Sequence, residues 1–202
     1  VRIFKQNLSG KSDRIFIDQK SGLTKLLRNE LSNRQKQVMT NNEIAKLNPI
    51  LWNGDSQMTG DEIHITRNIK TNNLDSLKIL NNAFIIEKDT LGIENFNQMK
   101  GINLFGKFKN NELKTIELVQ NTEMIYYLYD DDTNELIGID KAICSSIIME
   151  INNNSIKEIT FITNPEGEVF PEKDIELSLK ILNGFNWRIS EKITKKEEIF
   201  IK

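Results

Sequence analysis

The stretch Leu113-Lys114-Thr115-Ile116-Glu117-Leu118 has apolar residues at its first, fourth and sixth positions, and this pattern recurs along the chain. The other copies are Leu74-Asp75-Ser76-Leu77-Lys78-Ile79, Ile156-Lys157-Glu158-Ile159-Thr160-Phe161 and a degraded Leu23-Thr24-Lys25-Leu26-Leu27-Arg28. In the three good copies an asparagine stands eight residues after the first apolar residue, as Asn82, Asn121 and Asn164. Repeats of about 40 residues usually form one layer of an elongated architecture each, because a single unit cannot bury its apolar face alone.

Each good copy follows a turn signal, and each turn follows a strand that begins near Gly60, Gly101 or Gly138. The turns are Thr71-Asn72-Asn73, Asn110-Asn111-Glu112 and Asn152-Asn153-Asn154-Ser155. Asparagine tolerates positive φ and hydrogen-bonds to its own backbone, so these segments favour tight hairpins. The repeating unit is therefore predicted to be strand, turn and strand, and the region from Gly10 to the first copy follows the same plan.

Alternation along these strands predicts which side chains face the interior, because successive residues point to opposite faces. Lys78, Glu117 and Thr160 are predicted to face water. The apolar residues on the opposite faces are Ile63, Ile65, Leu77, Ile79, Leu104, Phe108, Ile116, Leu118, Ile159 and Phe161. Stacked hairpins with one apolar face curl into a sandwich, a roll or a barrel-like trough, so the sequence predicts an all-β fold with an apolar interior.

The composition limits the classes of function. The 202 residues suffice for one all-β domain with a sizeable core, and 27 basic against 29 acidic residues give no electrostatic case for nucleic-acid binding. The single Cys144 excludes an intrachain disulfide but does not identify the compartment. No apolar run approaches the roughly 20 residues of a membrane-spanning helix. Because Val1 lies inside an expected strand, we expect that an upstream segment has been removed.

Two regions depart from the strand pattern. In the segment 29–48, Thr40 and Glu43 form a capping-box pattern that predicts a short helix or ordered excursion before Pro49. After Pro171, acidic residues followed by good helix formers predict a short helix that Gly184 can cap. The charged segment 189–202 is predicted to be a tail unless a partner orders it. The expected organisation is a β domain at 1–171 with an insertion at 29–48, then a short helix and tail at 172–202.

Few residues point to catalysis or metal binding. His64 is the single histidine, which rules out Ser-His or Cys-His triads within the chain, and it is predicted to lie on the surface. Cys144 is interpreted as a small buried hydrophobe. The acidic segment Asp130–Glu135 lacks the ligand spacing of a calcium loop and is interpreted as a solvated hairpin loop. No catalytic residue, metal or cofactor is predicted.

The aromatic residues have structural interpretations. Tyr126 and Tyr127 are predicted to place one ring inside and one outside a strand, since neighbours on a strand face opposite sides. Trp52 and Trp187 could stack on a ligand, but core or edge packing is the preferred interpretation.

Several short stretches resemble the OstA-like proteins, the periplasmic lipopolysaccharide-transport family that includes the LptA-like bridge components. Besides the hairpin repeat, they are Pro49-Ile50-Leu51-Trp52, Gln57-Met58-Thr59-Gly60-Asp61, Phe96-Asn97-Gln98-Met99-Lys100-Gly101, Leu136-Ile137-Gly138 and Gly184-Phe185-Asn186-Trp187-Arg188. Together they span the chain from about Gly10 to Arg188. The degraded first repeat and the 29–48 insertion depart from the family pattern.

The resemblance implies an open, slightly twisted antiparallel β-jellyroll, or β-taco, whose apolar trough carries lipopolysaccharide acyl chains across the periplasm. The ten apolar residues named above would line that trough, and the insertion would cap one end of it. The resemblance also implies end-to-end joining to other transport proteins, or to further copies of the chain, by strand addition. Residues Val1 to Lys5 are the candidate upstream edge.

Two other hypotheses remain open at the level of sequence. In the first, the chain is a structural or scaffolding β-roll of the cell envelope, with the same apolar residues packed against one another and proteins as partners. In the second, it is an enzyme or a carbohydrate-binding module that uses the Asp130–Glu135 loop or the tryptophans. The first differs from the lipid carrier in whether a cavity exists, which alternation does not reveal.

Overall fold

The computed structural model describes residues 1–5, 7–92, 94–152, 155–171, 176 and 180–200. Fifteen strands in this part of the chain form one antiparallel sheet. They are β1 (Arg2–Lys5), β2 (Leu8–Lys11), β3 (Arg14–Asp18), β4 (Leu23–Leu27), β5 (Ile50–Asn53), β6 (Ser56–Thr59), β7 (Glu62–Arg67), β8 (Leu74–Leu80), β9 (Ala83–Lys88), β10 (Phe96–Gly101), β11 (Asn103–Lys109), β12 (Glu112–Tyr129), β13 (Leu136–Asn152), β14 (Ser155–Ile162) and β15 (Glu166–Phe170). The helical elements are α1 (Asn33–Val38), α2 (Asn41–Ala45) and the 3-10 helices η3 (Ile189–Glu191) and η4 (Lys196–Phe200).

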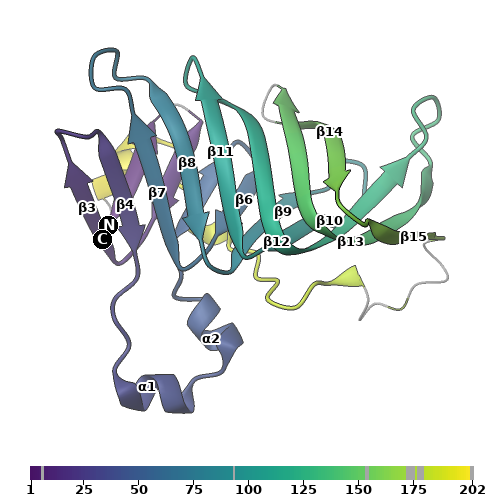
Figure 1. Cartoon of the computed structure of the whole chain (residues 1–202), viewed down its shortest axis with the longest axis horizontal. Coiled ribbons are helices and arrows are strands. Elements are labelled where there is room, and N and C mark those ends of the chain that lie inside the picture. Colours follow the sequence, from purple (N-terminus) through teal and green to yellow (C-terminus); the bar gives the residue numbers. More distant parts are fainter. Residues whose placement is uncertain (6, 93, 153–154, 172–175, 177–179, 201–202) are drawn as a thin grey trace.

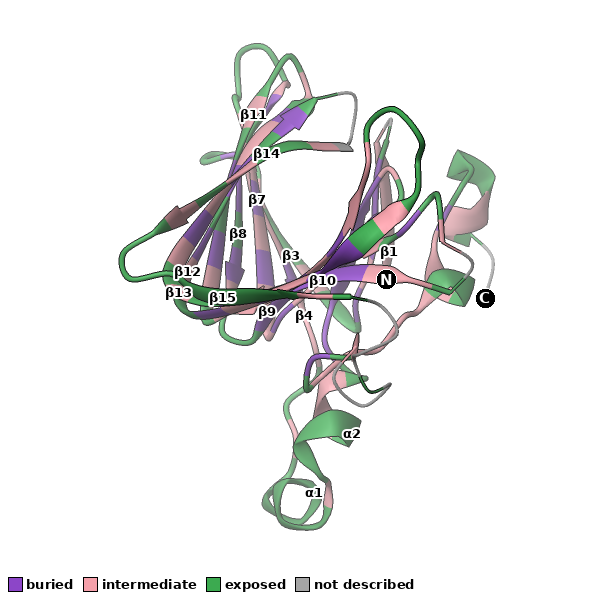
Figure 2. Cartoon of the chain, turned by 90° about the vertical axis from the view of Figure 1, so that its right-hand side faces the viewer, coloured by how far each residue is buried: buried purple, intermediate pink, exposed green. Residues whose placement is uncertain are grey.

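The sheet is folded lengthwise into two walls that meet along one line (Figures 1 and 2). Its main path runs β1-β2-β5-β6-β9-β10-β12-β11-β8-β7-β4-β3, and β13 adds to β12 and pairs with β14 and β15. We call β3, β4, β7, β8, β11, β14 and residues 112–119 and 146–152 the first wall. The second wall contains β1, β2, β5, β6, β9, β10, β15 and residues 122–129 and 136–144. This arrangement confirms the predicted all-β open jellyroll.

The asparagines of the repeat lie on the fold line, where the chain passes from one wall to the other. In each good copy two consecutive residues have positive φ: Asn81 and Asn82, Gln120 and Asn121, and Thr163 and Asn164. At the second of these pairs the register of β12 against β13 shifts between Val119 and Thr122. Asparagine adopts the left-handed conformation more readily than most residues, which explains its recurrence at the end of the motif.

Gly60 lies on the same line between β6 and β7. A Cβ atom there would lie 2.2 Å from Cγ2 of Ile79. The two walls approach so closely at this corner that a residue without a side chain is required.

Strand register aligns the interior side chains into rows that run along the trough. Nearest the fold line, the row on the first wall consists of Ile15, Leu26, Ile63, Ile79, Leu104, Leu118, Ile147 and Phe161. The facing row on the second wall consists of Ile3, Gly10, Leu51, Met58, Ile85, Met99, Met124, Ala142 and Gly167. The apolar members of both rows contribute to one hydrophobic cluster, so the core of the molecule lies between the walls.

The second wall is buried on its outer face as well. A second apolar cluster forms there from Phe84, Ile86, Ile125, Tyr127, Ile139 and Leu182. We call residues 180–200 the strap, because this segment lies along that face. Leu182 N donates to Gln98 Oε1 at 2.9 Å, and Arg188 N donates to Gln57 Oε1 at 2.7 Å, so two buried glutamines hold its backbone.

The strap differs in part from the sequence prediction. The segment 189–202 was expected to be a tail, but residues 189–200 fold into η3 and η4 and pack on the molecule, with Ile193 buried. This segment packs on the molecule because ion pairs hold it there, such as Lys192 Nζ with Asp55 Oδ1 at 2.7 Å. The linear sequence does not reveal these pairs. Most of the predicted helix at 172–184 falls outside the described residues.

The insertion contains the two short helices α1 and α2. The capping box predicted at Thr40 and Glu43 is present, and Ser32 and Gln35 form a second one at the start of α1. Neither helix contains a buried residue, and both project from the fold-line side of the sheet (Figure 1). The expectation that this insertion caps an end of the trough is therefore wrong. Ile44 and Ala45 of α2 are half-buried, but they line a hollow together with fold-line residues such as Asp61 and Asn82 and not an end of the interior.

Candidate functional site: an apolar trough between the walls

The trough between the two walls is the candidate functional site. The structure brings together all ten residues that alternation predicted to face inward, and each belongs to the main hydrophobic cluster or packs against it. Seven of them are buried: Ile63, Ile65, Leu77, Ile79, Leu104, Ile116 and Leu118. Phe108, Ile159 and Phe161 are partly buried. Whether these residues bind lipid stays a prediction.

The interior is closely packed near the fold line. Ile79 and Leu104 on the first wall and Leu51 on the second wall have no exposed surface. At the downstream end, Phe161 on β14 is only partly buried, since β14 pairs with β13 alone. The interior is therefore less enclosed at its downstream end than near the fold line.

Methionine is concentrated on this interior surface. Of the five methionines in the chain, four are buried in the main cluster: Met58, Met99, Met124 and Met149. Methionine is unbranched and flexible, so it adapts to ligands of irregular shape more easily than a β-branched residue does. The second wall contributes three of the four, which makes it the more deformable side of the trough.

The second wall also presents a polar row that sequence reasoning did not identify. Register aligns Asn53, Ser56, Glu87, Asn97, Tyr126 and Asp140 on its interior face, one step farther from the fold line than the methionines. Alternation did not identify the inward-facing residues here, because β9 begins with Ala83-Phe84-Ile85-Ile86, a continuous apolar run. Such a run is typical of a strand that is buried on both faces, and the strap provides the second cover.

Burial favours the neutral, protonated forms of the titratable side chains in this row. Burial raises the pKa of Glu87, and the nearby carboxylates of Asp55 and Asp89 add to the increase against a hydrogen bond from Ser56. Burial also raises the pKa of Asp140 and of Tyr126. The trough is consequently apolar on the first wall, and on the second wall it changes from apolar to weakly polar toward the rim.

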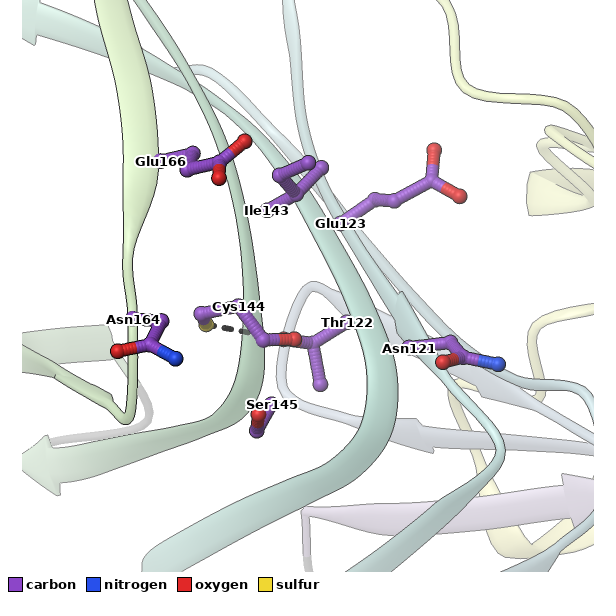
Figure 3. A pocket seen from close by; sticks show the side chains of 8 residues that line it. All are labelled: Asn121, Thr122, Glu123, Ile143, Cys144, Ser145, Asn164 and Glu166. Atoms are coloured by element: carbon purple, nitrogen blue, oxygen red, sulfur yellow. Dashed lines mark hydrogen bonds between the residues drawn. The ribbon is translucent and has the colours of Figure 1, made fainter.

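His64 and Cys144, the single histidine and the single cysteine of the chain, both contact neighbouring protein groups. His64 lies on the outward face of β7, with Nε2 2.9 Å from Glu62 Oε2 and 15% of its side chain exposed, so it is less solvated than predicted. Cys144 is partly buried at the edge of a hollow of about 350 Å³ on the fold line of β12 and β13 (Figure 3). Its Sγ lies 3.0 Å from Thr122 Oγ1 and donates to the Ser146 carbonyl oxygen at 3.1 Å. The residues that line this hollow include no histidine that could activate the thiol, and the single histidine of the chain, His64, lies on β7.

The Asp130–Glu135 segment forms the hairpin loop that the sequence predicted. Asp130 accepts hydrogen bonds from the backbone amide and the hydroxyl of Thr133, at 2.8 and 3.0 Å, and from the backbone amide of Asp132 at 3.0 Å, and these contacts lower its pKa. Within the described ranges, no group of three or more histidine, cysteine, aspartate or glutamate residues is placed to hold a metal ion. None of the helices in the described residues is both long and apolar enough to cross a membrane.

The aromatic predictions are confirmed. Tyr126 packs against the interior cluster and Tyr127 belongs to the outer one. Trp52 is buried, and its ring centroid lies 4.9 Å from that of Trp187 in an edge-on arrangement. The two tryptophans therefore attach the strap to the second wall, and they pack edge-to-face against each other rather than offering a platform for a ligand.

Comparison with known proteins supports the fold. No family model matches the sequence, and a search of curated proteins finds no match. Among solved structures, the chain is similar to LptH from Pseudomonas aeruginosa, the LptA homologous periplasmic component of the lipopolysaccharide transport device. The similarity has a TM-score of 0.52 at 9% sequence identity and covers 81% of this chain and 95% of LptH. At that identity the likeness concerns the fold, and it agrees with the LptA-like architecture that the sequence motifs indicated.

Proposed function

We propose that this chain is a non-enzymatic periplasmic carrier or bridge that binds the acyl chains of lipopolysaccharide in its apolar trough during transport to the outer membrane. The observation that carries the proposal is the single apolar cluster that runs across the strands of both walls. The fold shared with LptH, a periplasmic component of lipopolysaccharide transport, supports the choice of ligand and compartment.

The energetics suit a carrier. Burying ten methylenes of an acyl chain contributes about 8 kcal/mol at roughly 0.8 kcal/mol each, before the costs of association and ordering reduce it. The apolar rows near the fold line, with their methionines, offer no directional contacts, so they let such a chain slide and favour reversible binding. Because the middle of the trough is packed, binding there requires the walls to separate along their rims.

The terminal strands offer sites for joining other proteins end to end. At the upstream end the last strands of the two walls are β1 and β3, and at the downstream end they are β15 and β14. Arg2 Nη1 donates to the Glu198 carbonyl oxygen at 2.8 Å, which places η4 of the strap beside β1. We therefore propose β3, in place of the segment Val1 to Lys5 that the sequence suggested, and β14 as the edges that add strands of further copies or of other transport proteins.

The alternative function is a scaffolding β-roll of the cell envelope. The observation that favours it is the burial of seven of the ten predicted lining residues against one another. In that case the apolar interior serves stability alone, and apolar ligands do not enter it.

A binding experiment with variants at the downstream end separates the two functions. Phe161 faces the trough and Thr160, beside it on β14, faces solvent. We expect Phe161→Asp to lower the affinity for purified lipopolysaccharide at least about tenfold, because the carboxylate would have to be buried against the acyl chain. Thr160→Asp is the matched control and should bind like the unmodified protein. Equal binding by both variants, with circular dichroism showing that both are folded, would contradict a lipid-binding trough.

A further inference from the structure

The upstream end of the trough contains a cavity of about 200 Å³ between the two walls. Its apolar lining comes from strands of both walls: Ile3, Leu8, Ile15, Ile17, Ile65 and Leu74. It lies at the opposite end of the trough from Phe161, and it is bounded by the edge strands β1 and β3. The cavity is thus an apolar space within the trough that protein side chains leave unfilled.

Two basic side chains from opposite walls border this cavity. Lys5 on β1 donates from Nζ to the backbone oxygen of Asn72 at 2.6 Å. Arg67 on β7 donates from Nη1 to the side-chain Oδ1 of the same asparagine at 2.8 Å. Both cations are only partly exposed, and Asn72 links the rims of the two walls through them.

Neither of these two cations has an acidic partner among the described residues. Every ion pair found in the described part of the chain involves other residues, so no carboxylate there lies within pairing distance of Lys5 or Arg67. Burial, together with the charge of Arg67, lowers the pKa of Lys5. A pair of like charges beside an apolar cavity is unfavourable until an anion neutralises it. An ammonium has three donors and a guanidinium has five, so each keeps donors for an anion besides its bond to Asn72.

We propose that this cavity is a subsite for the anionic head of an acylated lipid, with Lys5 and Arg67 binding a phosphate or carboxylate and the adjoining chain filling the apolar space. Cations that converge from two walls recognise an anion by paired charge-assisted hydrogen bonds. The proposal rests on the proposed function, because it treats the cavity as one end of the lipid-binding trough. It adds an anchor point that sets the direction in which the lipid lies.

Calorimetric titration with short amphiphiles tests this subsite. Decyl phosphate and decanol, each below its aggregation limit, share one chain and differ in the charge of the head. We expect the protein to bind decyl phosphate at least about tenfold more tightly than decanol, and the Lys5→Gln/Arg67→Gln double variant to bind both with the affinity of decanol. The matched control is Lys78→Gln/Lys107→Gln, which removes two exposed cations of the first wall and should keep the preference.

Four results would overturn the proposal. A double variant at Lys5 and Arg67 that keeps the full preference for decyl phosphate would show that other groups bind the anion. Inorganic phosphate that binds as tightly as decyl phosphate would show a site for free anions instead of a lipid head. Decanol binding with no gain from the phosphate would overturn the subsite alone, whereas no binding of either amphiphile would contradict the lipid-binding trough as well.

Discussion

Single residues at the fold line determine where each strand pair bends. Asn121 lies where β12 passes between the walls, and its φ of 51° belongs to the left-handed region. Glycine has no Cβ to strain there, and asparagine is tolerated better than alanine. The recurrence of asparagine at the end of the sequence motif is therefore a conformational requirement of the corner, and no contact with a ligand is needed to explain it.

Substitution of Asn121 tests this interpretation. We expect Asn121→Ala to lower the free energy of unfolding by about 1 kcal/mol, because alanine must adopt the strained conformation. Asn121→Gly should remain within a few tenths of a kcal/mol of the unmodified protein. Urea denaturation measures both values, with Glu117→Ala on the exposed face of β12 as a control. Alanine and glycine variants of equal stability would show that the backbone is free to relax at this corner.

Among the elements, the strap distinguishes the second wall from the first. Glu191 in η3 accepts hydrogen bonds from Lys11 Nζ at 2.6 Å and from Arg188 Nε at 2.6 Å. Burial alone would raise the pKa of Glu191, but the bonds and charges of these two cations lower it from 4.5 to about 2. This cluster joins η3 to β2, and Arg188 also donates to the Asn48 carbonyl oxygen at 2.8 Å.

The acid dependence of stability follows from the lowered pKa of Glu191. The folded state holds this carboxylate ionised more strongly than the unfolded chain does, so its contribution is present above pH 4.5 and is lost as the pH falls toward 2. We expect Glu191→Gln to reduce the free energy of unfolding at pH 7 by roughly 1 kcal/mol, a value reduced by solvent screening. The difference between variant and unmodified protein should shrink as the pH falls from 4.5 and disappear below about pH 2. A difference in denaturation midpoint that is constant across this range would contradict the ion-pair account.

Predictability from sequence also differed between elements. The hairpins of the first wall were predictable because one face of each strand meets water, so Ile116 alternates with Glu117 and Ile79 with Lys78. Strands β5 and β9 of the second wall lack that alternation, since the strap covers their outer face. The polar row that includes Glu87 was hidden for the same reason. The contacts of the strap join residues more than 120 positions apart, such as Gln57 and Arg188, and local patterns do not reveal them.

At the scale of the whole molecule, the folded sheet converts a repeated hairpin into a trough whose two walls differ. The first wall is apolar inside and exposed outside, whereas the second wall contains three of the four buried methionines, the polar row and the strap. The central claim is that the interior accepts lipid acyl chains in addition to stabilising the fold. If this claim holds, we expect a ligand to meet the trough first at the two cations of the upstream end or at the partly buried Phe161 of the downstream end.

Photo-crosslinking in cells tests that claim most directly. A photoreactive side chain at Ile116, buried on the interior face of β12, is compared with one at Glu117, the exposed neighbour on the outer face. If the trough carries lipopolysaccharide, an adduct forms from position 116 and not from position 117. No adduct from position 116, or equal adducts from both positions in folded protein, would contradict the account and leave a packed scaffold.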